Sequence, residues 1–190
     1  MAICCQTSSR SHHARMRGGV LGVWLMLAIV VLAACDPLQG SGTGTPPDPS
    51  KYIKVDAASH SAIVTLIAGY PATDFQFNYD GYGNGALVLT VPAGWSVTIQ
   101  CENRGTVPNS CAVVSNNSST PIDPSWTTPD PGRGLDPGQS ASFAFTPDQP
   151  GGYRIASLVD GHEASGMWAD LEVVGSGGKV KSPTLYAPPS

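Results

Sequence analysis

The sequence predicts an all-β domain, a Greek-key β-sandwich or barrel of about eight strands, preceded by an export signal and a flexible tether. Short apolar runs follow one another along the chain, and each is bounded by Gly, Pro, Asn or Asp. No stretch shows a convincing 3.6-residue period. Charged residues make up only 13 % of the chain, whereas Gly (22) and Pro (17) are abundant. This composition is typical of strands and turns rather than helices.

The expected domain covers residues 51–175. Residues 62–68 (AIVTLIA) are rich in β-branched side chains, and residues 140–146 (SASFAFT) alternate apolar and small polar ones. We expect the intervening polar, Pro-rich residues 116–138 to form a long surface loop around Trp126, and residues 176–190 to be a disordered tail. The strands are expected at residues 52–55, 62–68, 75–79, 86–91, 95–101, 111–115, 140–146, 152–159 and 168–174.

The N-terminal segment has the features of a lipoprotein signal peptide. Residues 1–34 carry three arginines and then an uncharged apolar run, which ends in Leu-Ala-Ala directly before Cys35. Cleavage would leave Cys35 as the lipidated residue, and residues 35–50 as a Gly/Pro-rich linker. The alternative is a transmembrane anchor, but the 17 uncharged residues 18–34 are at the lower limit for crossing a bilayer. We therefore predict an exported protein, lipid-anchored on the outer face of the cytoplasmic membrane.

The charge balance argues against nucleic acid as a partner. Three of the ten Lys and Arg residues lie in the predicted signal, so seven cations face fourteen Asp and Glu residues beyond Cys35. Phosphate binding requires a basic face, which this acidic body does not offer. The membrane, reached through the lipid anchor, is the partner that the sequence predicts.

Two cysteines remain for the exported domain once Cys4 and Cys5 leave with the signal and Cys35 is lipidated. Cys101 and Cys111 form an even pair in an oxidising compartment, which favours a disulfide. The alternative of two buried free thiols stays open on sequence grounds. Alkylation with and without reductant distinguishes the two states by mass.

The most informative segment is residues 151–168 (GGYRIASLVDGHEASGMW). Ser157, His162 and Met167 stand at intervals of five and run into Gly-Met-Trp. This segment resembles the last ligand loop of sulfocyanins, a family of cupredoxins associated with respiratory electron transfer. The segments 75–85 (FQFNYDGYGNG), 91–95 (VPAGW) and 103–114 (NRGTVPNSCAVV) resemble further signatures of that family.

The resemblance covers most of residues 60–174 and implies a cupredoxin fold with a type 1 copper site. Such a site uses two imidazoles, one thiolate and a weak axial thioether. In the aligned pattern, however, Asn109 stands where the family has its strand histidine, and Ser157 stands where it has its cysteine. An amide and a hydroxyl are poor substitutes for these ligands. We expect Ser157 and Asn109 to hydrogen-bond each other across the vacated pocket.

His162 and Met167 are the metal-ligand candidates that remain, and His60 and Cys111 are weaker additions. The first hypothesis is a binding or structural module without a cofactor, which contacts a respiratory or copper-handling protein. The alternative is an electron carrier or Cu(I) shuttle that uses His162 and Met167, with copper as the cofactor. We do not expect an enzyme, because Ser157, Asp160 and His162 lie within six residues, where a triad geometry is unfavourable.

Overall fold

A computed structural model describes residues 45–70, 76–116 and 118–189. The predicted signal, Cys35 and most of the linker lie outside the described residues. Within the described part no helix is long and apolar enough to span a membrane. A short 3₁₀ turn, η1 (Pro49–Tyr52), leads into the first strand.

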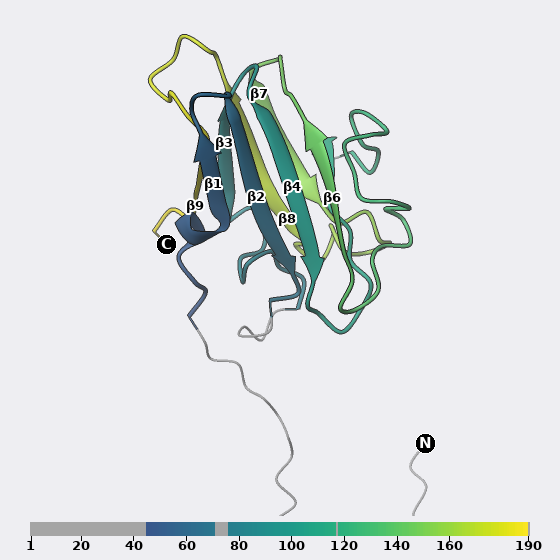
Figure 1. Cartoon of the computed structure of the whole chain (residues 1–190). Helices are drawn as coiled ribbons and strands as arrows, with labels where there is room; N and C mark the ends of the chain where they lie inside the picture. The colour runs from purple at the N-terminus through teal and green to yellow at the C-terminus, as the bar shows by residue number, and fades with distance from the viewer. Residues whose placement is uncertain (1–44, 71–75, 117, 190) are drawn as a thin grey trace, which may run out of the picture. The chain divides into compact units, whose positions relative to one another are not determined.

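The predicted all-β sandwich is confirmed. One sheet has the order β1-β2-β4-β6 and the other has the order β5-β7-β8-β3-β9. Figure 1 shows the first sheet in front of the second. The strands are β1 (Ile53–Asp56), β2 (Ser61–Ala68), β3 (Val88–Pro92), β4 (Ser96–Asn103), β5 (Ala112–Ser115), β6 (Ser140–Phe145), β7 (Gly151–Ala156), β8 (Trp168–Val174) and β9 (Thr184–Tyr186).

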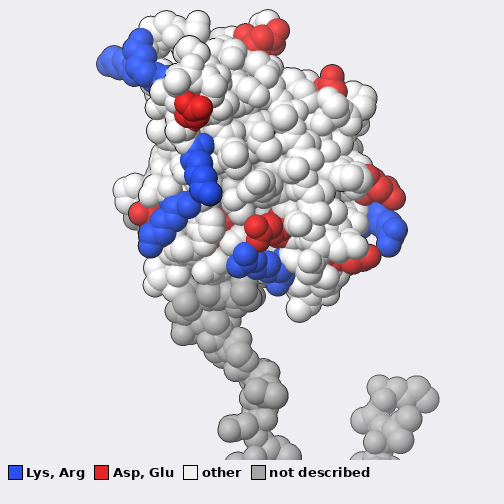
Figure 2. Space-filling view, in the orientation of Figure 1, with Lys and Arg blue, Asp and Glu red and all other residues white. Residues whose placement is uncertain are grey.

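Crossovers between the sheets produce the Greek-key character. β2 pairs in parallel with β4, and β3 pairs in parallel with β8, so neither pair is a simple hairpin. Alternation along β4 places Val97, Ile99 and Cys101 in the interior and leaves Ser96 and Gln100 exposed. Apolar residues from both sheets form a single main cluster between them. Figure 2 shows few charged side chains, of both signs, on the face turned to the viewer.

Two expectations about the strands were wrong. No strand forms in residues 76–79, and residue 75 lies outside the described part. Tyr79 instead makes isolated bridges to Ala68 and Tyr82, which turn the chain back on itself. The tail is also ordered in part, because residues 184–186 pair with β3 and bury Leu185. Three residues are too few to stand out in a sequence pattern, and they gain their stability from docking on an existing strand.

Candidate functional site

The loop with the family-like spacing joins β7 to β8 at one end of the sandwich. Ser157 directly follows β7, and Met167 directly precedes β8. Ser157 N donates to Met167 O at 3.1 Å, and Met167 N donates to His162 O at 3.0 Å. These backbone bonds close the loop and hold its three marked residues near one another. Ser157, His162 and Met167 are all buried.

Gly166 allows a second segment to approach this loop. Its φ is +91°, and a Cβ placed there would lie 2.5 Å from Asn84 Oδ1. Asn84 N donates to Gly166 O at 2.7 Å, which fixes the β2–β3 connection against the loop. Glycine satisfies both the positive φ and the close contact.

Ser157 is the centre of a buried hydrogen-bond network. Its Oγ accepts from Ser110 N at 3.2 Å and lies 3.2 Å from His162 Nδ1. Ser110 Oγ in turn accepts from Leu158 N at 2.9 Å. Since Ser157 is only 1 % exposed, its hydroxyl is satisfied entirely by protein groups.

His162 is held in a largely apolar position. Its side chain is 7 % exposed, and the Phe77 ring meets it edge to face, with the ring centroids 4.8 Å apart. Burial lowers the pKa of His162 below its ordinary value of 6.5. The imidazole is therefore neutral near pH 7, and one ring nitrogen is available as an acceptor or ligand.

Asn109 does not form the predicted bond to Ser157. Its Nδ2 donates to Asn103 Oδ1 at 3.0 Å and to Val107 O at 3.1 Å. Asn109 Oδ1 is buried without a hydrogen-bond partner among the described residues. The expectation was wrong because the next residue, Ser110, supplies the contact to Ser157, and the Asn109 amide is engaged by the segment that precedes it.

The two cysteines of the domain are joined by a disulfide. Cys101 lies in β4 and Cys111 directly precedes β5, so the bond connects the two sheets with Cα atoms 6.1 Å apart. A disulfide sulfur is not a thiolate, and neither cysteine can replace the missing ligand in this state.

His60 is remote from the loop. It precedes Ser61 at the start of β2, whereas the loop lies near the opposite end of that strand, where Asn103 contacts Asn109. The length of β2 alone separates the two ends by roughly 23 Å. His60 is exposed and meets the Trp95 ring edge to face, with centroids 5.2 Å apart. Of the candidates from sequence, the structure thus brings Ser157, His162 and Met167 together and leaves His60 outside.

The donors at this position do not fit type 1 copper. The set comprises a hydroxyl, one imidazole, one thioether and an amide that is bonded elsewhere, whereas the centre requires a thiolate and two imidazoles. In the part of the chain that the structure describes, no group of three or more His, Cys, Asp and Glu residues is arranged to hold a metal ion. The hydroxyl of Ser157 also occupies the Nδ1 edge of the imidazole.

Three supporting residues were missed by sequence reasoning. Ser110 bridges two loops, and the buried Tyr79 hydroxyl donates to the Ser110 carbonyl. Asp80 is fully buried, accepts from Ile67 N at 2.8 Å through Oδ1, and has no partner for Oδ2 within the described residues. Burial raises the pKa of Asp80 to about 7. Tyr79 and Asp80 lie in a segment that the sequence singled out, but nothing in the pattern indicated these contacts.

Comparison with known proteins gives a consistent result. The model of the sulfocyanin (SoxE) domain family matches residues 49–130 and 127–183. The sulfocyanin of Sulfolobus acidocaldarius is 29 % identical over 128 residues, which cover 60 % of this chain and 64 % of the relative. The matched region is thus less than two thirds of that relative's length.

A solved structure of rusticyanin supports the fold. A crystal structure of rusticyanin variants matches with a TM-score of 0.50 and 21 % identity, covering 67 % of this chain and 87 % of rusticyanin. Reduced auracyanin from Roseiflexus castenholzii matches with a TM-score of 0.44 and 22 % identity, over 61 % of this chain and 98 % of auracyanin. At such identities the rusticyanin match shows the fold alone, which is the cupredoxin sandwich.

Proposed function

Because this chain belongs to the sulfocyanin domain family, we propose that it is a membrane-anchored cupredoxin-fold lipoprotein that has lost type 1 copper and acts as a binding or structural module. Its partner would be a respiratory or copper-handling protein on the outer face of the cytoplasmic membrane. The family and the fold are the premise of this proposal. The residues at the copper position support the loss of the metal.

One observation carries the proposal, which is the direct contact between Ser157 Oγ and His162 Nδ1 at 3.2 Å. In a type 1 centre the metal stands between the thiolate and the imidazole, and each donates electrons to it. Here a hydroxyl and an imidazole satisfy each other instead. Ser110 N donates a second hydrogen bond to the Ser157 hydroxyl.

The pocket is consistent with a fold that needs no metal. Its polar groups are paired within the protein, with the exception of Asn109 Oδ1 among the residues described. Backbone bonds close the loop from Ser157 to Met167. The disulfide adds a covalent connection between the sheets. Loss of copper would therefore leave the domain folded, which is the condition for a retained structural role.

The lipid anchor is the second part of the proposal. Cys35 would carry the lipid, and the thirteen residues between it and Pro49 would reach at most about 45 Å. That reach lets the domain contact a neighbouring membrane protein while it stays on the surface. Mass analysis of the protein extracted from membranes tests this directly, since an unlipidated Cys35 would remove the anchor.

Copper analysis tests the loss of the metal. The mature, membrane-extracted protein is assayed for bound metal as isolated and is then loaded with Cu(II) while its visible spectrum is recorded. We expect no stoichiometric copper and no intense charge-transfer band, because that band requires a thiolate ligand. Reversibly reducible copper at one per chain would overturn the proposal.

Competition with a Cu(I) chelator tests the shuttle hypothesis, in which His162 and Met167 hold Cu(I). We expect the chelator to remove all Cu(I) from the wild-type domain. Retention that disappears in both His162→Ala and Met167→Leu would replace our proposal with the shuttle. Retention that both variants keep would place copper at an unrelated site and leave the vacated pocket as described.

A further inference from the structure

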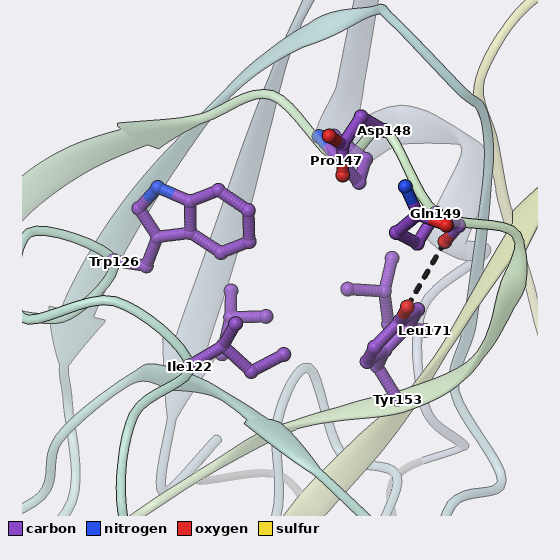
Figure 3. A pocket seen from close by; sticks show the side chains of 8 residues that line it. Ile122, Trp126, Pro147, Asp148, Gln149, Tyr153 and Leu171 are labelled. Atoms are coloured by element: carbon purple, nitrogen blue, oxygen red, sulfur yellow. Dashed lines mark hydrogen bonds between the residues drawn. The ribbon is translucent and has the colours of Figure 1, made fainter.

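A small apolar hollow lies where the β5–β6 and β6–β7 loops meet strands β5, β7 and β8, away from the vacated copper position. Its free volume is about 80 Å³, well below that of a typical small-molecule pocket, so it can take a single side chain rather than a whole ligand. Figure 3 shows Trp126 and Tyr153 on opposite sides, with Ile122 between them and Asp148 at one edge. Val113 of β5 and Leu171 of β8 also line it.

The walls of the hollow are held in place by hydrogen bonds and packing. Val113 N donates to Trp126 O at 2.9 Å, and Ile122 N donates to Val113 O at 2.9 Å, so one strand residue fixes both loop residues. The Trp126 ring packs on Phe145, with centroids 5.5 Å apart. Tyr153 Oη donates to Gln149 O at 3.0 Å. The hollow is thus preformed, which lowers the entropy cost of binding.

The charge at the hollow is acidic. Asp148 is the one charged residue among those that line it. Asp123, which follows Ile122, has its pKa lowered by hydrogen bonds from the Ser125 hydroxyl and amide, so it is an anion at neutral pH. Arg154, the neighbour of Tyr153, faces the other side of the sheet and pairs with Glu163 at 3.0 Å.

We propose that this hollow binds the side chain of a lysine from a partner protein. The aliphatic stem contacts Ile122, Trp126 and Leu171, while the ammonium group stays at the mouth beside Asp148. Lysine combines an apolar stem with a charged, hydrated end. The apolar lining of the hollow matches the stem, and Asp148 at its edge matches the ammonium group. Ile122, which is 44 % exposed in the free protein, is covered in the complex.

This site is independent of the vacated copper position. Tyr153 lies four residues before Ser157 on the β7 side, a separation of about 13 Å along an extended chain. None of the residues lining the hollow belongs to the Ser157–His162 network. Whether the domain binds copper therefore does not affect lysine binding at the hollow. A result that refutes one proposal leaves the other untouched.

The test uses two probes of equal stem length, n-butylammonium and n-butanol, titrated into the full-length chain labelled with ¹⁵N. The indole N–H resonance of Trp126 reports occupancy. We expect butylammonium to bind roughly two- to fivefold more tightly than butanol, the range for a solvent-exposed charge interaction. Raised salt should reduce this preference, because exposed charges are screened.

Two matched variants identify the carboxylate. Asp148→Asn should abolish the preference for butylammonium while it leaves butanol binding unchanged. Asp130→Asn alters an exposed aspartate of the β5–β6 loop that does not line the hollow, and it should retain the preference. Equal binding of both probes to the wild type would overturn the proposal in favour of a neutral apolar occupant. So would an unchanged preference in Asp148→Asn, or the absence of any shift at Trp126.

Discussion

Asp80 should make the stability of this domain fall as the pH rises towards neutrality. Its carboxyl group is completely buried, and only Oδ1 has a partner, the amide of Ile67 at 2.8 Å. Burial raises its pKa from 3.8 to about 7, against the lowering effect of the hydrogen bond from Ile67 N; Glu102 raises it and Arg104 lowers it by smaller amounts. The perturbation that tests this is Asp80→Asn, which keeps the shape of the side chain and removes the charge.

The direction and size follow from proton linkage. A pKa raised in the folded state means that the native protein binds its proton more tightly than the unfolded chain does. The associated stability is fully present below pH 3.8 and is lost as the pH rises through about 7. The shift of about three units, at about 1.4 kcal/mol each, corresponds to about 4 kcal/mol.

The assay is urea unfolding of the wild type and Asp80→Asn at intervals from about pH 4 to about pH 8. Other titrating groups cancel in the difference between the two, including His162, whose lowered pKa acts in the opposite direction. From the low to the high end of this pH range, the free energy of unfolding of the variant minus that of the wild type should rise by about 4 kcal/mol. A pH-independent effect of the substitution on stability does not alter this rise. Asn also tolerates the φ of +53° at this position. A difference that does not change with pH would refute the reasoning.

Three further outcomes are expected. The double variant Asn109→His with Ser157→Cys should bind copper and show the intense visible band of a thiolate centre, since the loop spacing is retained; a folded variant without copper would contradict the family alignment. Replacing Cys101 and Cys111 with alanine should lower the free energy of unfolding by about 3 kcal/mol relative to the disulfide-bonded wild type, the value for a loop of this length. Urea unfolding measures this loss, and the reduced wild type should match the variant. Tyr79→Phe should cost about 1–3 kcal/mol, because a buried carbonyl loses its donor; a loss within error would mean that water replaces the phenol.

The strand pattern was largely readable from the sequence because it depends on local features. Residues 62–68 and 140–146 were expected as strands, and β2 and β6 lie there. β-branched residues, alternation and flanking turn-formers act over a few positions, so they survive in any correct tertiary structure. Residues 75–79 resembled a strand by the same criteria, but bridges from Tyr79 to Ala68 and Tyr82 produce a turn instead. The competing influence was pairing with residues just outside the run, Ala68 before it and Tyr82 after it.

The candidate site was only partly readable. The spacing of Ser157, His162 and Met167 located the loop, and the substitutions at Asn109 and Ser157 indicated that a copper ligand set was incomplete. The actual partner of Ser157 was not foreseen. It is Ser110, 47 residues earlier, and only the packing of two loops at one end of the sandwich brings them together.

The sequence by itself determined the class of the fold, the family of the domain and the chemistry that its donors offer, because these depend on residue type and on spacing along the chain. The tertiary structure alone decided that the Asn109 amide is bonded away from Ser157, that Asp80 is buried with an unpartnered oxygen, and that Trp126 and Tyr153 enclose a hollow. Those features depend on which segments meet across the two sheets. Distances between residues far apart in sequence are set by the packing of the whole domain, and no local pattern encodes them.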